Sequence, residues 1–275
     1  MTPRTKPDPF EEYVRKVASG SKPSARGEEN LRDALSGPVE EPSEAQAAPV
    51  PDAPEQAGAA PAGLPATRPL PEIIMGGGLS PVEVLALFRA QIERSGGAFA
   101  ARLGSDAFDL LKKEFPDCRY SLECMAVSAG PPAPSPADPR FVAVVTSGRS
   151  DMKAAAEAEF LLSECGVPCH MFVDFGSTGI QRLTSSMREI GGAAVCLVFA
   201  GMDGGLPSIL GGLYGGPVVA VPTSGGSRPP FGGIAPLMSM LASGTPGITV
   251  VSVDNGLGAA AAAVRILGPR GGAAS

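Results

Sequence analysis

The sequence predicts an α/β protein whose larger part is a doubly wound parallel sheet with helices on both faces. One indication is an alternation, repeated five times after residue 140, of a short apolar run and a helix-like segment. Another is that glycine-rich loops follow the runs Val195–Ala200, Pro217–Val221 and Ile248–Val253. Strands that alternate with helices of this length form parallel sheets covered on both faces, and right-handed connections make such sheets doubly wound.

Residues 140–275 supply the strands and helices of this sheet. Ser150 is a candidate cap for a helix that runs through Ala154–Cys165 and stops at Gly166. The next helix has its inner face at Ile180, Leu183, Met187 and Ile190, and the last helix covers Ala259–Leu267. The two remaining predicted strands are Phe141–Thr146 and Val167–Asp174.

A smaller α/β unit is predicted at residues 68–128. Ser80 should cap a helix, with Pro81 at its first position and Glu83 completing a capping box. Leu85, Phe88 and Ile92 form its apolar face, and Gly96 and Gly97 end it. Ser105 is a candidate cap for a second helix to Glu114, and the predicted strands are Pro71–Met75, Ala98–Leu103 and Tyr120–Val127.

Three further segments lie outside these two units. Residues 1–37 contain one amphipathic helical pattern, and residues 38–67 form a proline- and alanine-rich linker without lysine, arginine or aromatic residues. Such a composition cannot bury a core, so we expect this linker to be disordered. Residues 129–139 are again rich in proline and should form a stiff connection to the larger domain.

Composition excludes several classes of function. The net charge of -6 gives no general attraction to nucleic acid. Five cysteines without paired spacing argue against a secreted disulfide framework, and a single histidine argues against a zinc site, so we expect no metal ligands among them. No apolar run reaches the roughly 18 residues of a membrane span, and no signal peptide is evident. These features favour a cytoplasmic protein with no nucleic-acid or membrane partner.

The polar candidates lie in five loops that follow the predicted strands. The carboxyl ends of parallel strands meet at one edge of a sheet, where open α/β sheets bind ligands. Glycine permits close approach to a ligand, and the free N–H groups of a helix start attract anions, so the set predicts a phosphorylated ligand. No loop matches a Walker A or GxGxxG pattern. The loops are Ser147–Asp151, Asp174–Gly179, Gly201–Gly205, Pro222–Gly233 and Asp254–Gly258.

These loops resemble those of the LarB family, which acts in nickel-pincer cofactor biosynthesis and has a core domain related to PurE, the aminoimidazole ribonucleotide (AIR) carboxylase. The resemblance rests on Asp174-x-Gly-x-x-Gly179, Gly201-Met-Asp-Gly-Gly-Leu-Pro-Ser208, Val221-Pro-Thr-Ser224, Phe231-Gly-Gly233 and Asp254-Asn-Gly-x-Gly-Ala259. It covers the carboxyl-terminal half, and Arg68-x-x-x-Glu72 followed by Ser80-Pro81 extends it upstream. It implies that residues 140–275 form a PurE-like, flavodoxin-like three-layer domain.

The resemblance also implies a reaction. LarB proteins carboxylate the pyridinium ring of nicotinic acid adenine dinucleotide, with CO2 or bicarbonate as co-substrate. They then hydrolyse its phosphoanhydride, releasing AMP and a biscarboxylated pyridinium mononucleotide. Mg²⁺ is a candidate cofactor, because carboxylates can bind it. A homo-oligomer is implied as well, and the small residues of Gly256–Ala263 would suit close packing of chains.

The candidate site residues fall into two groups. Carboxylates and a hydroxyl that can move protons or bind Mg²⁺ are the catalytic candidates, namely Asp203, Asp174, Ser150 and Asp151. Arg149 and Arg182 can hold phosphates. The nucleotide-binding candidates are Ser147, Gly148, Gly176, Gly179, Arg182, Gly201, Gly204, Thr223, Ser224, Asp254, Asn255 and Gly256. Helix capping is the structural alternative for Ser150, Asp151 and Asn255.

Three positions depart from the LarB pattern. The family's nucleophilic cysteine follows a Leu-Asn-Ser motif, and this chain has Leu241-Ala-Ser-Gly244 in its place. Asp203 stands where LarB has glutamate, and Gln181 where it often has histidine. Two alternatives therefore remain beside a LarB-type enzyme. One is a PurE-like AIR carboxylase or mutase, although PurE has a Ser-Ala-His-Arg pattern where this chain has Ser177–Arg182. The other is a nucleotide-binding protein that has lost catalysis.

Overall fold

The computed structural model of the protein describes residues 70–131, 140–176, 179–225 and 230–268. The expectations for residues 1–37 and 38–67, for most of the linker 129–139 and for the last residues of the chain lie outside these ranges.

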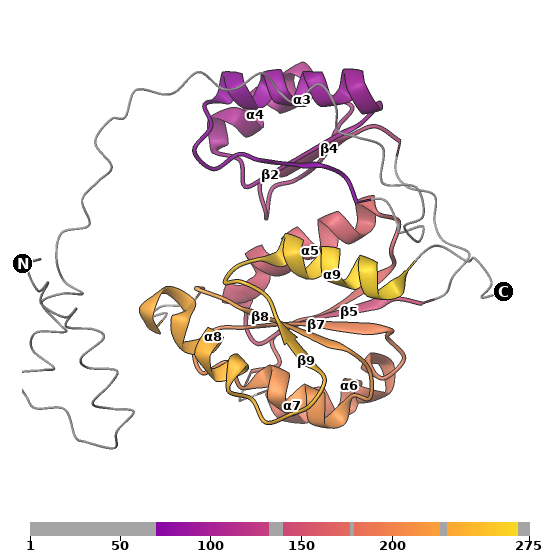
Figure 1. Ribbon diagram of the computed structural model, residues 1–275, viewed down its shortest axis with the longest axis vertical. Coiled ribbons are helices and arrows are strands. Elements are labelled where there is room, and N and C mark those ends of the chain that lie inside the picture. Colours follow the sequence, from indigo (N-terminus) through magenta and orange to yellow (C-terminus); the bar gives the residue numbers. More distant parts are fainter. Residues whose placement is uncertain (1–69, 132–139, 177–178, 226–229, 269–275) are drawn as a thin grey trace, which may run out of the picture. The chain divides into compact units, whose positions relative to one another are not determined.

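The larger sheet has five parallel strands in the order β6-β5-β7-β8-β9 (Figure 1). The first of these strands along the chain, β5, pairs with both β6 and β7. The winding direction therefore reverses after β6, which is the doubly wound order of flavodoxin-like folds. The predicted fold class is confirmed. The strands are β5 (Val142–Thr146), β6 (Cys169–Phe172), β7 (Val195–Ala200), β8 (Val218–Pro222) and β9 (Ile248–Val250).

Helices cover both faces of this sheet (Figure 1). Successive strand residues point to opposite faces, so Val142 and Val144 of β5 join one apolar cluster while Ala143 and Val145 join the other. Helices α5 (Met152–Glu164) and α9 (Gly256–Leu267) close the first face. Helices α6 (Ile180–Ile190), α7 (Leu206–Leu213) and α8 (Ile234–Leu241) close the second.

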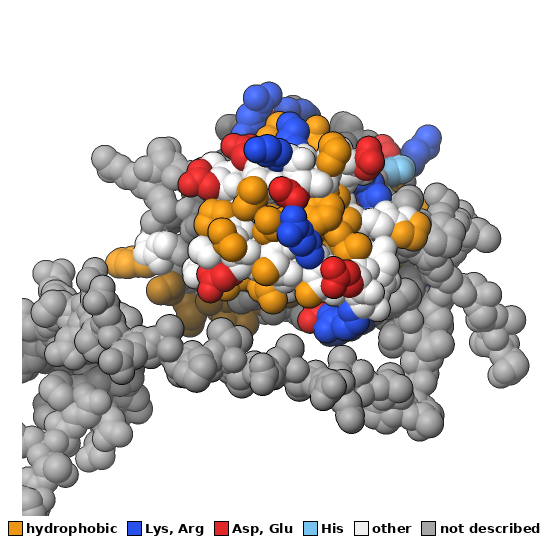
Figure 2. Space-filling model, turned by 90° about the horizontal axis from the view of Figure 1, so that it is seen from above, with side chains coloured by type: hydrophobic (Ala, Val, Ile, Leu, Met, Phe, Trp, Pro, Cys, Tyr) orange, Lys and Arg blue, Asp and Glu red, His pale blue; other side chains and the backbone are white. Residues whose placement is uncertain are grey.

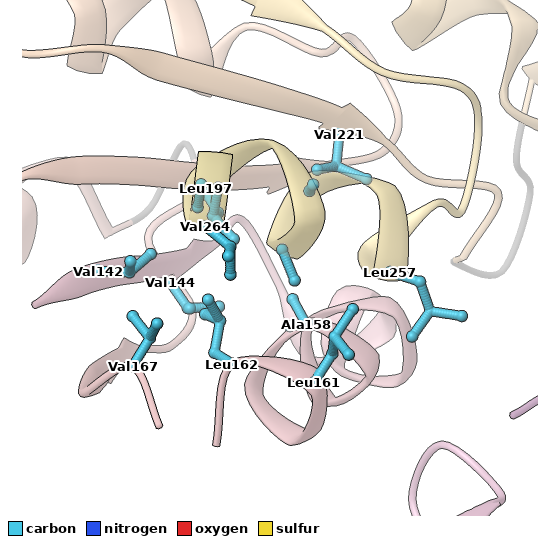
Figure 3. Close-up of a cluster of buried hydrophobic side chains, with 14 of the residues drawn as sticks. Val142, Val144, Ala158, Leu161, Leu162, Val167, Leu197, Val221, Leu257 and Val264 are labelled. Carbon is cyan, nitrogen blue, oxygen red and sulfur yellow. The ribbon is translucent and has the colours of Figure 1, made fainter. Parts of the chain in front are cut away.

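The first cluster is the larger of the two cores (Figure 3). Leu161 and Leu162 of α5 and Val264 of α9 are fully buried against the strands. Burial of side chains of this size contributes about 1.5–3 kcal/mol each, so this contact between helices and sheet is a main source of stability. The same cluster includes Phe99 and Ala101 of the smaller unit, which ties that unit to the outer side of α5.

Helix α9 differs from its prediction in where it begins and in what its small residues contact. It begins at Gly256 rather than at Ala259. Of its small residues, which were expected to pack against another chain, Gly256, Ala259, Ala260 and Ala263 are buried within this one. A Cβ atom on Gly256 would lie 1.9 Å from the carbonyl oxygen of Ala154, so glycine lets α9 approach α5 closely. Only the half-buried residues Gly258, Ala261 and Ala262 are left for the chain-to-chain contact expected at Gly256–Ala263.

The smaller unit is a four-stranded mixed sheet with the order β1-β2-β4-β3. Strand β1 pairs parallel with β2, and the other pairs are antiparallel. The elements are β1 (Ile73–Met75), α3 (Pro81–Ser95), β2 (Ala98–Ala101), α4 (Ser105–Glu114), β3 (Arg119–Ser121) and β4 (Ala126–Ala129). The capping box is confirmed, because Ser80 N–H donates to the Glu83 carboxylate at 2.8 Å and Glu83 N–H to Ser80 Oγ at 3.3 Å.

Four local predictions need correction. The single strand predicted at Tyr120–Val127 is a hairpin of β3 and β4, whose turn contains no glycine or proline. Gly104, not Ser105, precedes α4 and makes no side-chain cap. Ser150 lies inside the short 3₁₀ turn Arg149–Asp151 and caps no helix. On the inner face of α6, Ile180 is exposed, whereas Leu183 and Ile190 are buried.

Candidate functional site

Asp151 joins two of the loops at the carboxyl edge of the sheet. Its carboxylate is 1% exposed and accepts hydrogen bonds from Ser147 Oγ at 2.9 Å and Gly148 N–H at 2.8 Å. A third bond, of 2.5 Å, comes from the hydroxyl of Thr223 after β8. These donors satisfy a buried carboxylate that would otherwise be costly, and they leave it little freedom to contact a ligand. Ser147, Gly148, Asp151 and Thr223 are thus brought together, with Asp151 as their acceptor.

Asp254 makes an equivalent link between the loops after β8 and β9. Its carboxylate accepts Ser224 N–H at 2.8 Å and Ser224 Oγ at 2.5 Å. Its neighbour Asn255 accepts Gly258 N–H at 2.8 Å and so caps α9, which is the structural alternative considered for that residue. The carboxyl edge is therefore a network of three loops, held by two aspartates.

The glycines of these loops are explained largely by contacts within the chain. A Cβ atom on Gly225 would lie 2.3 Å from the carbonyl oxygen of Ser150, so the β8 loop rests directly on the β5 loop. A Cβ atom would also lie under 3.0 Å from a backbone oxygen at Gly176, Gly179, Gly204 and Gly256, whereas at Gly201 it would make a tight contact of 3.0 Å with Thr223 Oγ1. At Gly148 a Cβ atom would make only ordinary contacts. Most candidate nucleotide-binding glycines are thus required for loop packing, whether or not a ligand binds beside them.

A cavity of about 330 Å³ opens beside this network. From the core domain its walls include Ser150, Lys153, Thr223, Ser224 and Asp254. Lys153 lies one turn after Arg149. It makes no ion pair with any described residue, so its ammonium is available to an anion. The smaller unit adds Arg102, Leu103 and Met125 to the wall.

Sequence reasoning missed several of these cavity residues. Lys153 could have been found, because it follows Arg149 by four positions at the start of a predicted helix. Arg102 and Glu157 could not, since they are far apart in the chain and only folding pairs them. Arg102 Nε and Nη2 donate to the two oxygens of Glu157 at 2.9 and 3.0 Å.

Asp174 and Arg182 lie elsewhere on the same edge and engage one another. Arg182 Nη2 is 3.1 Å from the Asp174 carboxylate and also donates to the Asp174 carbonyl oxygen. The guanidinium lies over the ring of Phe175, 5.9 Å from its centroid. Both side chains are more than half exposed, so a ligand can reach them, but phosphate binding by Arg182 would compete with this ion pair.

Asp203 projects from the β7 loop. It is exposed, and among the residues that the structure describes its carboxylate accepts only a long hydrogen bond of 3.4 Å from Gly205 N–H. The preceding residue, Met202, has φ of 50° and is 71% exposed. Asp203 does not line the cavity, and its carboxylate is available for contact with a ligand on the outer part of the edge.

Gly244 follows α8, and its neighbours Ser243 and Thr245 hydrogen-bond Ser208 in the first turn of α7, directly after the Gly201–Gly205 loop. It lies between α8 and β9, in a connection that enters the sheet, whereas the candidate loops leave it. The position is exposed, its φ is outside the left-handed region, and a Cβ atom there would meet nothing within 4 Å. A side chain would therefore fit at Gly244 without strain.

The five cysteines lie outside the cavity walls. Burial raises the pKa of the Cys169 thiol to about 11 and that of Cys196 to about 12. Burial also raises the pKa of Cys118 and Cys124. A thiol with a raised pKa is a poor nucleophile near neutral pH, so these four are not activated.

Metal binding has limited support from side chains. Among the described residues, no group of three or more His, Cys, Asp or Glu side chains is placed to hold an ion. Magnesium commonly uses one or two carboxylates together with the phosphates of its ligand.

The surface and the helices add two observations. On the face shown in Figure 2, Lys and Arg are interspersed with Asp, Glu and apolar side chains. That face therefore presents no extended patch of a single charge. No helix in the described ranges is long and apolar enough to span a membrane.

The fold and site define a class: a doubly wound α/β domain whose ligand loops gather at the carboxyl edge of a parallel sheet. Residues 141–272 match the family model of AIR carboxylase, so an AIR carboxylase-like domain forms this part of the chain. An uncharacterized protein of Methanocaldococcus jannaschii is 41% identical over 121 residues, covering 43% of this chain. The match spans 46% of that protein, about half its length.

Proposed function

We propose that the AIR carboxylase-like domain binds nicotinic acid adenine dinucleotide or a related nucleotide and performs LarB-type chemistry on it. The observation that carries the proposal is the cavity beside the β5, β8 and β9 loops. There the hydroxyls of Ser150 and Ser224 and the ammonium of Lys153 line one space, a combination that suits a phosphorylated sugar. A volume of about 330 Å³ is at the small end for ligand sites and suits one half of a dinucleotide.

The remaining half would lie along the exposed part of the edge, near Asp174 and Asp203. Asp203 is our candidate for moving a proton or orienting water during hydrolysis, because its carboxylate is exposed and only weakly engaged. Mg²⁺ would be held by phosphate oxygens and a carboxylate of this edge, and would neutralise phosphate charge. CO2 or bicarbonate would be the co-substrate for carboxylation.

A second candidate is nucleotide binding without the carboxylation step. It is favoured by Gly244, which offers no nucleophile where LarB has cysteine, and by the raised pKa of Cys169 and Cys196. Under this alternative the loop network and the cavity still bind the ligand.

A PurE-type reaction has less support. The single histidine of the chain, His170, lies in β6, where its ring stacks on Phe141 and its Nδ1 is 3.0 Å from Glu189. It therefore does not take the place of the PurE histidine in the loop after that strand.

The test is incubation of the full chain with nicotinic acid adenine dinucleotide, ¹³C-bicarbonate and Mg²⁺, followed by mass spectrometry of the products. A LarB-type enzyme gives AMP and a labelled pyridinium mononucleotide. Saturable binding with neither product supports the second candidate. Carboxylation of aminoimidazole ribonucleotide, or no nucleotide binding at all, would contradict the proposal. The variant Asp203→Asn should lose AMP release and keep binding.

A further inference from the structure

Helix α5 carries two buried carboxylates that face the smaller unit. Glu157 and Glu164 are seven positions apart, about two turns, so they lie on one side of the helix. Their side chains are 4% and 8% exposed. Each is paired with an arginine of the smaller unit, Glu157 with Arg102 and Glu164 with Arg119. Removing one partner from such a pair leaves an uncompensated buried charge, so both arginines fix the smaller unit to α5.

Only one of the two arginines reaches the ligand loops. Arg102 Nη2 donates to the backbone carbonyl oxygen of Asp254 at 2.6 Å, in addition to its two bonds to Glu157. The other groups bound by Arg119 are the carbonyl oxygen of Gly130 and the hydroxyl of Ser128, both in the smaller unit. Arg102 lines the cavity, and Arg119 does not.

The backbone around Arg102 is held in an uncommon conformation. Arg102, Met125 and Asp254 have φ of 55°, 52° and 55°, and all three line the cavity. Left-handed backbone at residues other than glycine persists only where the surroundings enforce it, and it is concentrated at functional sites. Leu103 N–H donates to the Met125 carbonyl at 3.0 Å and joins two of these segments.

We propose that Arg102 is a positioning residue of the ligand site, through which the smaller unit holds the Asp254–Ser224 loop pair in place. By fixing the Asp254 carbonyl, Arg102 fixes the carboxylate that binds Ser224. Ser224 carries one of the two hydroxyls that we assign to the ligand, so this inference rests on the proposed function for its effect on binding. The smaller unit, which lies outside the AIR carboxylase match, would then complete the site.

The experiment compares Arg102→Lys with Arg119→Lys in the full chain. Lysine keeps the positive charge but lacks the planar fork, so it cannot bind Glu157 at two atoms and Asp254 at once. Arg119→Lys is the matched control. It weakens a similar buried ion pair to the same helix, α5, and Arg119 makes no contact with the ligand loops. Thermal unfolding should show comparable losses of stability for both variants.

Two readouts separate positioning from a purely structural role. Amide hydrogen exchange in peptides spanning Ser224 and Asp254 should accelerate by about tenfold in Arg102→Lys and stay unchanged in Arg119→Lys. The Kd for nicotinic acid adenine dinucleotide, measured by calorimetry, should rise about tenfold in Arg102→Lys and less than about twofold in Arg119→Lys. Equal exchange and equal Kd in the two variants would overturn the inference.

Failure of the inference differs from failure of the proposed function. If the unmodified protein binds neither nicotinic acid adenine dinucleotide nor AMP, the proposed function fails, and hydrogen exchange still decides the role of Arg102. If Arg102→Lys does not fold, the double variant Arg102→Gln with Glu157→Gln removes both charges. Its control is Arg119→Gln with Glu164→Gln. Faster exchange at Ser224 in the first double variant, without faster exchange in the second, supports the inference. Equal exchange in both double variants contradicts it.

Discussion

The hydroxyl of Thr223 donates a 2.5 Å hydrogen bond to the carboxylate of Asp151, which lies 72 residues earlier in the chain. Both residues are 1% exposed. This bond connects the loop after β5 to the loop after β8, and together with Ser147 and Gly148 it satisfies Asp151. The buried network thereby fixes the edge on which the cavity opens.

Replacing Thr223 by Val should therefore lower the free energy of unfolding by about 1–3 kcal/mol. Valine keeps the shape of the side chain but leaves the buried carboxylate with one donor fewer. Urea unfolding measures the change. Thr184→Val is the control, because Thr184 is exposed on α6 and its hydroxyl bonds only the Ile180 carbonyl of the same helix. Equal losses of unfolding free energy in the two variants would show that the buried hydrogen bond contributes no more to stability than the exposed one.

Gly256→Ala should destabilise the protein by more than about 2 kcal/mol. The added methyl would lie 1.9 Å from the Ala154 carbonyl oxygen, so α9 would have to move away from α5. Gly212→Ala is the opposite case, since a Cβ atom on that exposed residue of α7 meets nothing within 4 Å. It should stabilise by about 0.5–1 kcal/mol through helix propensity. Thermal unfolding checks both, and a neutral Gly256→Ala would refute the close contact.

Gly244→Cys should restore formation of a covalent adduct with nicotinic acid adenine dinucleotide, if the chain binds that ligand as LarB does. The position is open, and its backbone accepts a side chain, so misfolding would not explain a failure. Intact-protein mass spectrometry detects the adduct as a ligand-sized mass increase.

Two controls define the outcome of that experiment. Gly212→Cys places a thiol at another exposed glycine and should give no adduct. The unmodified protein should give none either. An adduct on the unmodified protein would show that another residue is the nucleophile, and the assignment of Gly244 as the impaired position would then be wrong.

We expect a homo-oligomer whose contact uses α7 and α8 rather than α9. Exposed apolar side chains lie on these two helices at Ile209, Leu213, Ile234, Met238 and Leu241, and Met202 and Phe231 are exposed in the segments that precede them. Apolar surface that recurs along one face of a helix is commonly covered by a partner. Met238→Glu should shift the protein to a monomer in light scattering, whereas Ile266→Glu, on α9, should not. A mass of 27.7 kDa for the unmodified protein would contradict the oligomer.

Local patterns in the sequence predicted the elements well. The alternation of apolar runs and helical segments placed all five strands of the large sheet, and the Ser80–Glu83 capping box was confirmed by its hydrogen bonds. The hairpin at Arg119–Ala129 was missed. Its turn has no glycine or proline to mark it, and Met125 adopts φ of 52° there, which local propensity disfavours.

The sequence by itself determined the fold class and the edge where the loops gather, because strand and helix periodicities are local and parallel strands align their carboxyl ends. Only the tertiary structure decided what each loop residue does. Gly256 lets α9 contact α5 at Ala154, and the carboxylate of Asp151 is surrounded by hydrogen-bond donors. Arg102 binds both Glu157 and Asp254. Each of these roles depends on a partner distant in the chain, and only the packing of α5 against its neighbours brings such partners within bonding distance.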